Sequence, residues 1–349
     1  MMGEQIPSWC NIPFVPRPPI SERTLTPGSS PLSHVFDTNG VRALGRLRES
    51  SWRRLLALWK AKGYTTGWIP WVAYEITSTN FIFKGTVVSQ LEVERIVRAV
   101  QRFDILADGD VLPDVDQLFV RSMYDHVGAP GGPSHFSEIE DDLRGRIHIC
   151  KQVTNRNQIG QVPDGKGSFY VGFQDNKIVW YKAFKSNFAS HAPKAVAAVE
   201  KLIKDSGLTK DSPDEDVAKT IIPYILAIIL HNAERLRVPR HVQDAVAKLW
   251  EPPSHVDPTK PRKPHMIPDV PFTVAVLAEC WYYAEFARGR LTRTHLDNDG
   301  PDFKIATYMC KAEYFVTNDT NLRKLISHYT LEADRRIINP SQFYRAVVA

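Results

Sequence analysis

The sequence predicts an α/β fold with a central parallel sheet between layers of helices. Two short apolar runs, His34–Phe36 and Tyr314–Val316, are followed closely by an acidic residue and then by a helical pattern. Helical periodicity also recurs between the strand-like runs, as in chains that alternate strands with crossover helices. The content of 43% hydrophobic and 24% charged residues is typical of a globular protein.

Changes in composition divide the 349 residues into four segments. Residues 1–32 are rich in proline, so we expect an extended N-terminal arm. Residues 33–127 and 271–349 carry the strand and helix patterns of one α/β core. Residues 128–270 begin at a Gly- and Pro-rich break and end in a proline-rich stretch, and we expect them to form an inserted α+β region.

The expected elements follow the chain in order. For the first core segment we expect a strand that starts at His34, a helix with a leucine stripe at 44–58, a strand-like run at 68–72, and then a helix at 87–101, a strand at 103–106 and a helix near 114–127. For the rest of the chain we expect a strand at 147–153, a hairpin at 168–184, helices near 193–206, 214–236, 239–250 and 271–290, and strands at 314–316 and 336–338.

Charge and cysteine content narrow the class of protein. The net charge of +5 is mildly basic, which is compatible with a nucleic-acid partner but does not establish one. The four cysteines are far apart, so we expect neither structural zinc nor a disulfide framework, and a cytoplasmic location. Residues 1–30 lack the pattern of a signal peptide, and the apolar run Ile221–Leu230 is too short to span a bilayer, so no membrane association is expected.

Four acids are placed where chemistry is commonly found in α/β proteins, at ends of strands or starts of helices. They are Asp37, Glu75, Asp302 and Asp319. Clustered carboxylates raise each other's pKa, and a hard divalent cation such as Mg²⁺ or Mn²⁺ removes that conflict. Such ions activate water and stabilise charge on a phosphodiester, so the pattern predicts a metal site for hydrolysis of a nucleic-acid backbone. Asp297 and Asp299 are alternatives to Asp302, or extra ligands.

The residues around these acids resemble the motifs of the PIN-domain nuclease family. The matching stretches are Phe36-Asp37-Thr38-Asn39, the run from Pro70 to Glu75 with its acid opening a helix, Asp302 with Ile305-Ala306, Val316-Thr317-Asn318-Asp319, and Asn339-Pro-Ser-Gln-Phe343. The resemblance covers about 33–127 and 271–349, with a large insertion between the two parts. It is greatest to the toxin-type PIN ribonucleases of toxin–antitoxin modules.

The resemblance implies a PIN-like three-layer α/β/α core and a Mg²⁺- or Mn²⁺-dependent endoribonuclease. Asp37, Glu75, Asp302 and Asp319 would be both the metal ligands and the catalytic residues. RNA would be the substrate, an antitoxin-like protein inhibitor could be a partner, and a homo-oligomer is compatible with the family. Two alternatives stay open: a PIN-like DNA nuclease, and a catalytically inactive nucleic-acid-binding or scaffold protein.

Several residues near the acids have two interpretations each. Thr317 could orient a ligand or be an ordinary strand residue, and Asn39 could cap the following helix or bind near the metal, with the cap favoured. Arg42, Arg46 and Arg53 lie on a basic helix face that could bind RNA, although such faces are usually only solvated. The tryptophans of that helix are more often core residues than stacking surfaces, and His34 is interpreted as structural.

Overall fold

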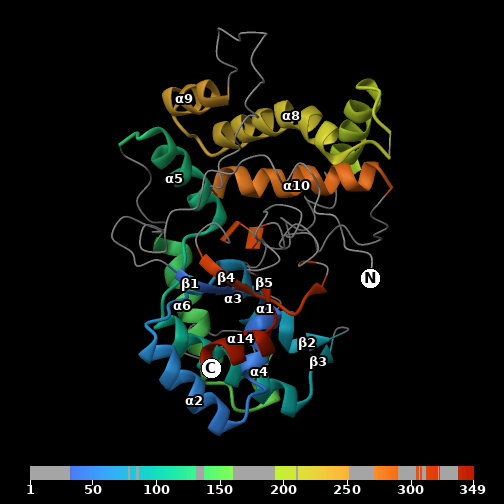
Figure 1. Ribbon diagram of the computed structural model, residues 1–349. Coiled ribbons are helices and arrows are strands. Elements are labelled where there is room, and N and C mark those ends of the chain that lie inside the picture. The colour runs from blue at the N-terminus through green and yellow to red at the C-terminus, as the bar shows by residue number, and fades with distance from the viewer. Residues whose placement is uncertain are drawn as a thin grey trace.

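The computed structural model describes residues 32–77, 79–83, 86–130, 137–159, 193–209, 211–250, 271–289, 304–305, 307–308, 312–320, 322 and 337–349. The expected N-terminal arm up to residue 31, the hairpin at 168–184, and the acids Asp297, Asp299 and Asp302 lie outside these residues. The described chain is mixed α/β and mostly helical, with a small parallel sheet near its middle (Figure 1). The α/β prediction is therefore confirmed.

The sheet joins the two ends of the chain. It consists of β1 (Leu32–Phe36), β4 (Ala312–Val316) and β5 (Ile337–Ile338), in the order β1-β4-β5, and both pairings are parallel. Every residue of β1 is buried, as is usual for a parallel strand covered on both faces. Because β4 is central, the residues that follow it lie beside the residues that follow β1.

The edge of β1 that faces away from β4 also forms backbone hydrogen bonds. The carbonyl of Thr65 accepts from the backbone N–H groups of Ser33 and His34, at 3.1 Å each. Trp68 in turn forms a parallel bridge with Val111. The expected strand at 68–72 is thus reduced to this bridge, because Pro70 already begins a helix.

Helices surround the sheet. Their bounds are α1 (Thr38–Leu44), α2 (Glu49–Ala61), α3 (Pro70–Thr77), η3 (Thr79–Phe81), α4 (Gln90–Ala107), α5 (Val115–Val127), α6 (Ser137–Lys151), η4 (Arg156–Gln158) and α14 (Pro340–Val348). A short antiparallel pair, β2 (Ile82–Phe83) and β3 (Thr86–Val87), precedes α4.

Three sequence predictions in this part are wrong. The single helix expected at 44–58 is two helices, α1 and α2, separated by a corner at residues 45–48. The strand expected at 103–106 is the end of α4, in which Phe103 and Leu106 continue the buried helical stripe. The strand expected at 147–153 belongs largely to α6, where Leu143, Ile147 and Cys150 are buried at helical spacing.

A second group of helices lies beyond the sheet. It contains α8 (Asp214–Arg235), α9 (Arg240–Trp250) and α10 (Pro271–Ala287), and a further helix covers 193–205. Here α10 packs against α5 and α8, while α9 packs against the same two helices (Figure 1). In contrast, α6 packs against α3 and α4. The predicted helices 214–236, 239–250 and 271–290 are present within a few residues of their expected bounds.

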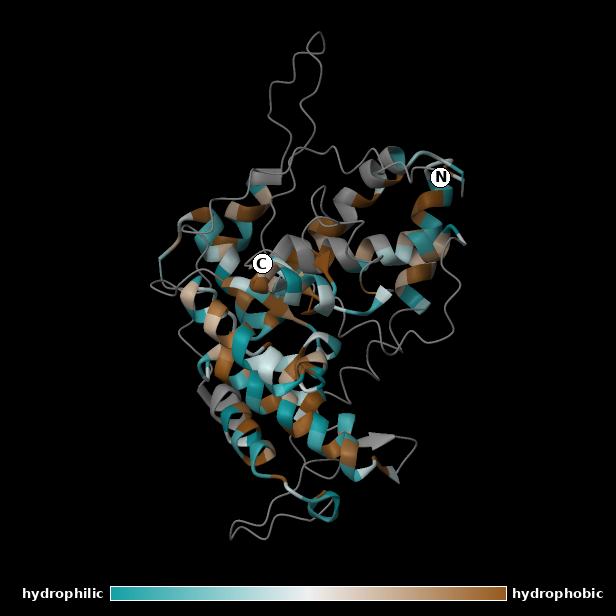
Figure 2. Cartoon of the chain, turned by 60° about the horizontal axis from the view of Figure 1, so that its bottom comes forward, coloured by the Kyte–Doolittle hydropathy of each residue, from teal (hydrophilic) through white to brown (hydrophobic). Residues whose placement is uncertain are grey.

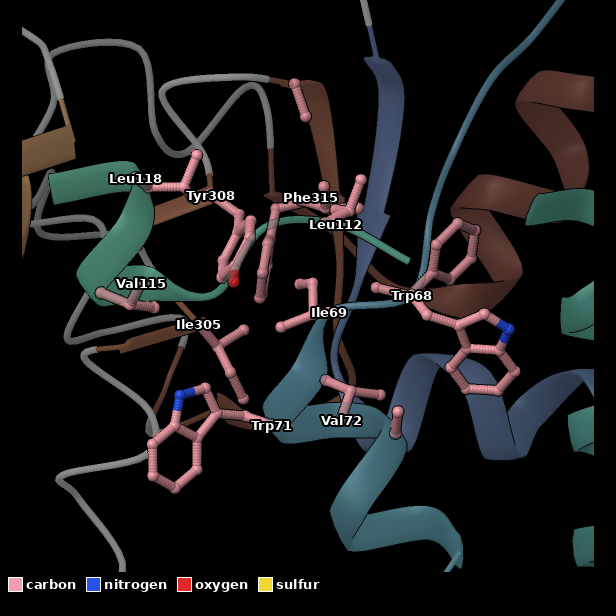
Figure 3. Packing of buried hydrophobic residues seen from close by; sticks show 14 of the residues in the cluster. Trp68, Ile69, Trp71, Val72, Leu112, Val115, Leu118, Ile305, Tyr308 and Phe315 are labelled. Atoms are coloured by element: carbon pink, nitrogen blue, oxygen red, sulfur yellow. The ribbon is translucent and has the colours of Figure 1, made fainter. Parts of the chain in front are cut away.

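Side chains of β1 alternate between two packed faces. His34 and Phe36 lie on the face covered by α2, α4 and α14, where Phe36 contacts Phe103 and Phe343 edge to face. Val35 lies on the other face with Phe315, its partner in the register. Figure 3 shows Phe315 beside Tyr308 and Ile69, with Leu118 of α5 on the far side of Tyr308. The sheet therefore has helical cover on both sides.

His34 is one of the buried polar residues of this core. Its ring lies among the rings of Phe36, Trp59, Tyr64, Tyr314 and Phe343, with centroids 5.1–6.4 Å away. Burial lowers its pKa to about 3, so the imidazole is neutral at physiological pH. This environment agrees with a structural role.

Figure 2 shows hydrophilic and hydrophobic residues alternating around the described helices, as expected for helices with one buried face. Two apolar side chains of α4, Leu91 and Ile105, are exposed instead. No helix in the described part of the chain has both the length and the apolar character needed to cross a membrane.

The corner between α1 and α2 gives a test of the packing. A Cβ atom added at Gly45 would lie 2.1 Å from the carbonyl oxygen of Arg95 in α4. We expect Gly45→Ala to lower the free energy of unfolding by about 1–3 kcal/mol, as overpacking does. Gly145→Ala is the matched control, because a Cβ in this exposed position of α6 meets nothing within 4 Å.

The control should have the opposite sign, since alanine is favoured over glycine inside a helix by about 0.5–1 kcal/mol. Urea unfolding of both variants measures the two effects. Equal stability changes in the two variants would show that α1 does not approach α4 as described.

Candidate functional site

Asp37 is the buried centre of the candidate site. It follows the last residue of β1 and is the N-cap of α1, where its Oδ1 accepts a hydrogen bond from Gly40 N at 2.5 Å. Its Oδ2 accepts from the Thr317 hydroxyl at 2.5 Å, and only 4% of the residue is exposed. Gly40 permits the close approach of α1 to the sheet, since a Cβ there would lie 2.5 Å from Val316 O.

Thr317 connects Asp37 to the second acid. Its hydroxyl donates to Asp37 and accepts from the backbone N–H of Asp319 at 2.9 Å. Its own N–H donates to Ile338 O at 3.0 Å, which fixes the end of β4 against β5. The Asp319 carboxylate is held by the N–H of Leu322 at 3.0 Å. Of the two interpretations of Thr317, the geometry favours the orienting role.

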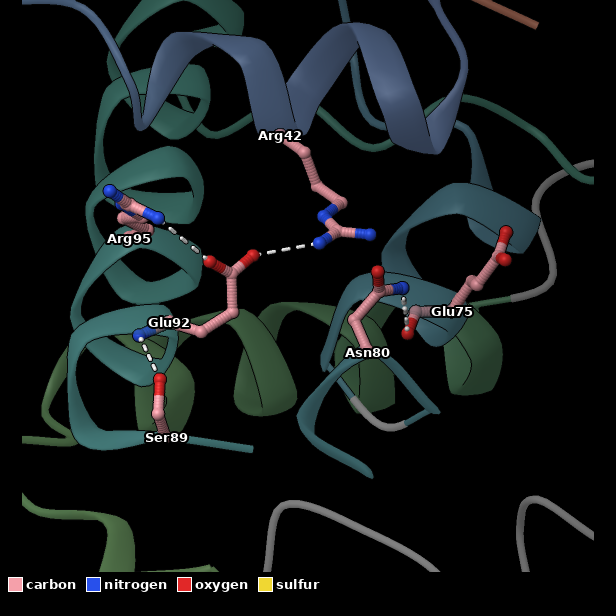
Figure 4. Close-up of polar contacts among 6 residues, drawn as sticks. All are labelled: Arg42, Glu75, Asn80, Ser89, Glu92 and Arg95. Atoms are coloured by element: carbon pink, nitrogen blue, oxygen red, sulfur yellow. Dashed lines mark hydrogen bonds and ion pairs between the residues drawn. The ribbon is translucent and has the colours of Figure 1, made fainter. Parts of the chain in front are cut away.

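Glu75 reaches the site from α3. The Thr38 hydroxyl donates to Glu75 Oε2 at 2.6 Å, so two neighbouring residues of the chain, Asp37 and Thr38, belong to the same site. Asn80 donates to the backbone carbonyl of Glu75 at 2.9 Å and ties the end of α3 to η3 (Figure 4). The expectation that Glu75 opens a helix is wrong, because α3 already begins at Pro70 and places Glu75 in its second turn.

Electrostatics couple the three acids. The pKa of Asp37 is raised to about 7, chiefly by burial, and the charges of Glu75 and Asp319 raise it further. The hydrogen bonds from Thr317 and Gly40 oppose this shift, because they stabilise the ionised carboxylate. Glu75 and Asp319 therefore both act on Asp37, at the carboxyl end of the parallel strands.

The fourth predicted acid, Asp302, lies outside the described residues, but the chain that follows it is partly described. Ile305 is buried and lies beside Trp71 of α3 in Figure 3. Tyr308 is fully buried, and its hydroxyl donates to Pro113 O at 2.6 Å, just before α5. Ile305 thus lies beside the helix that carries Glu75, whereas Tyr308 is bound to the chain before α5.

A metal ion would need several donor side chains close to one point. Among the described residues, no three His, Cys, Asp or Glu side chains are grouped closely enough to hold one ion. The carboxylate oxygens of Asp37 instead accept hydrogen bonds from their own scaffold, and so does an oxygen of Glu75 and of Asp319. The donors are all carboxylate oxygens, and burial together with two neighbouring acids raises the pKa of one of them, so their chemistry fits a hard divalent cation.

The remaining predicted residues have different environments. Asn39 is exposed in the first turn of α1 and does not cap it, because Asp37 is the N-cap; the favoured interpretation of Asn39 was wrong. Arg42 pairs with Glu92 at 2.7 Å and Arg53 with Glu49 at 3.0 Å, whereas Arg46 is exposed.

The tryptophans of α2 are core residues, as expected. Trp52 and Trp59 are 5% and 3% exposed, so they offer no stacking surface for bases. The basic face of α1 and α2 therefore consists of arginines and lysines without exposed aromatic rings from α2.

Sequence reasoning missed Thr38 and Gly40. Both stand in or next to the Asp-Thr-Asn motif, so the motif itself was a signal. Their roles depend on α3 and β4, which are distant in sequence, and only the fold shows what these residues contact.

Comparison of the chain with protein-family models, with curated proteins and with solved structures found no match.

The raised pKa of Asp37 predicts a pH dependence of stability. Native Asp37 keeps its proton up to about pH 7, whereas the unfolded chain releases it near its ordinary value of 3.8. The native state binds more protons between these two pH values, so stability should fall as pH rises through this window. Asp37→Asn removes the ionisation while its amide can still accept from Gly40.

We expect Asp37→Asn to exceed the original protein in stability by about 2–4 kcal/mol at pH 8, and the difference to shrink towards pH 4. Urea unfolding at several pH values measures it, with Asp108→Asn, at the exposed end of α4, as the control. A difference that does not change with pH would contradict the assigned environment of Asp37.

Proposed function

We propose that this chain is a metal-dependent nuclease with a PIN-like α/β/α core, and that its substrate is RNA. The observation that carries the proposal is the convergence of Asp37, Glu75 and Asp319 at the carboxyl end of a parallel sheet. That edge is where open α/β sheets form their sites. Glu75 and Asp319 raise the pKa of the buried Asp37, and this arrangement of three acids costs stability. Such clusters are characteristic of functional sites.

The fold supports the family part of the proposal. The sheet is parallel with helices on both faces, and its strands come from the two chain segments that resemble the family. The closing Asn-Pro-x-x-Phe motif also has a physical role. Asn339 and Gln342 form a reciprocal capping box at the start of α14, and the buried Phe343 packs against His34 and Phe36.

The proposed ion is Mg²⁺ or Mn²⁺, with Asp37, Glu75, Asp319 and Asp302 as its proposed ligands, and the three described acids would have to move closer together to share it. When bound, it would supply Lewis-acid stabilisation of the charge that develops on the phosphodiester. A cation would also relieve the repulsion among the acids, as protonation of Asp37 does in its absence.

The chain's own groups would position the reactants and move the proton. Water attacks phosphorus, a P–O bond to it forms, the P–O bond to the leaving nucleotide oxygen breaks, and that oxygen gains a proton. A carboxylate of the site, from Asp37, Glu75 or Asp319, would accept the proton of the attacking water. Thr317 and Thr38 hold the carboxylates of Asp37 and Glu75 in fixed orientations.

Cleavage assays with three variants test the function. We expect Mn²⁺-dependent cleavage of single-stranded RNA, reduced at least about a hundredfold in Asp37→Asn and in Asp319→Asn, because each removes an anionic ligand or base. Asp114→Asn is the matched control, since Asp114 is also a largely buried N-cap, at the start of α5, but outside the site.

The assay includes DNA of the same sequence. If the protein cleaves DNA but not RNA, its substrate is DNA and the proposed hydrolysis of phosphodiester bonds still holds. No cleavage of either polymer by the intact protein, together with no binding of Mn²⁺, would leave a catalytically inactive scaffold and contradict the proposal.

Thr38 gives a finer test of the same site. Thr38→Val removes the hydroxyl that orients Glu75, and we expect a loss of metal affinity or activity of about 10–100-fold, the usual effect of removing a group that orients a ligand. Thr38→Ser keeps the hydroxyl and should retain most of the activity. The apparent Mn²⁺ constant from cleavage rates distinguishes the variants, and equal constants in valine and serine variants would exclude a positioning role for Thr38.

A further inference from the structure

The corner between α1 and α2 brings arginines from separate parts of the chain to one surface. The backbone of Gly45 packs directly on α4, where a Cβ would lie 2.1 Å from Arg95 O and 3.0 Å from the Cβ of Ala99. Arginines of the corner, at positions 46 and 48, therefore lie next to the α4 residues 95–102. None of these proximities can be seen in the sequence.

One arginine in this group is part of the scaffold. Arg102 is 4% exposed, and its guanidinium donates to the carbonyls of Leu44 and Leu47 at 2.8 Å each. It also pairs with Glu49 at 2.9 Å and lies over the ring of Trp52, 5.3 Å from the ring centroid. Arg102 thus stabilises the end of α1 and the start of α2, and has no donor directed at solvent for a partner.

The acids of the corner are already shared. Glu49 pairs with Arg53 and Arg102, and Glu92 pairs with Arg42 at 2.7 Å and Arg95 at 3.3 Å. The third acid, Glu94, accepts from Gln90 at 3.0 Å. Each of the two glutamates with ion pairs therefore compensates for two arginines. Burial raises the pKa of Glu92, but the hydrogen bonds from Arg42 and Arg95 and the charges of Arg42 and Arg46 lower it, so Glu92 also offsets part of the charge of Arg46.

Three exposed arginines remain: Arg46, Arg48 and Arg98. Within the described part of the chain, none of them forms an ion pair. Burial lowers the pKa of Arg102, and the like charge of Arg98 lowers it further, so Arg98 lies near Arg102. An external anion at this surface would remove that repulsion.

We propose that Arg46, Arg48 and Arg98, here called the corner surface, bind the phosphate backbone of a polynucleotide strand. The proposal rests on the nuclease function, since the strand would be the substrate of the acidic site. The corner lies at the far end of α1 from Asp37, about 10 Å away at 1.5 Å per residue. Figure 4 shows Arg42 of the same helix between Glu92 and Glu75.

The placement has a chemical reason. Carboxylates that bind a cation repel phosphates until the cation is present, so a basic surface one helix length away can hold the polyanion without neutralising the catalytic acids. Guanidinium groups bind phosphate through two parallel N–H donors, which suits arginine better than lysine. The contacts are to the backbone, so binding should be independent of base sequence.

Equilibrium binding of labelled single-stranded RNA in EDTA, without cleavage, tests the corner surface in the full chain. We expect the double variant Arg46→Gln/Arg98→Gln to bind roughly tenfold more weakly at low salt. The slope of log affinity against log salt should fall by about 0.7 per lost contact, or about 1.4 in total. The matched control is Lys201→Gln/Lys204→Gln, which removes the same charge from exposed positions of the helix at 193–205.

Three results would overturn the proposal: equal loss of affinity in the control, no effect of the arginine variant, or no binding of RNA or DNA by the intact protein. If the arginine variant loses binding only to vesicles containing phosphatidylserine and binds RNA and DNA as before, the surface binds lipid and the proposal is overturned. If the arginine variant loses binding while the intact protein cleaves nothing, the nuclease function fails and the corner surface stands. If the arginine variant binds and cleaves RNA as the intact protein does, the proposal for the corner surface is wrong and the nuclease function stands.

Discussion

The hydrogen bond from Thr317 to Asp37 is the interaction on which the candidate site depends. It joins residues 280 positions apart and lies in the buried interior, where a carboxylate without partners would be costly. The register of β1 against β4 brings the two residues together, and Gly40 leaves the space for α1 to begin at the same point. Without this pairing, Asp37 and Asp319 would belong to unrelated parts of the chain.

The buried position of Asp37 has a cost for stability. The chain keeps a carboxylate near two other acids, although a neutral side chain could cap α1 equally well. Natural proteins accept such destabilising groups mainly where function needs them. The capping role of Asp37 and its proposed catalytic role are compatible, because the cap fixes the side chain against the sheet edge.

Much of this arrangement could be predicted from the sequence. The parallel strands at 34–36 and 314–316 and the helices near 114–127, 214–236 and 271–290 follow from periodicity and from apolar runs. A strand was predicted at Phe103 from a short apolar run and at Ile147 from an alternating pattern, but burial shows that both residues lie on the inner face of a helix. The ion pair of Arg42 with Glu92 and the hydrogen bond from the Thr38 hydroxyl to Glu75 depend on contacts between elements, which local sequence does not encode.

The most direct test of the account is the position of Mn²⁺ in crystals of the full chain, located by its anomalous scattering at a pH above 7. The account predicts a peak within about 2.0–2.6 Å of carboxylate oxygens from Asp37 and Asp319. A peak bound elsewhere, or none at saturating Mn²⁺ while Asp37 keeps its hydrogen bonds to Thr317 and Gly40, would show that the buried carboxylate is only a helix cap.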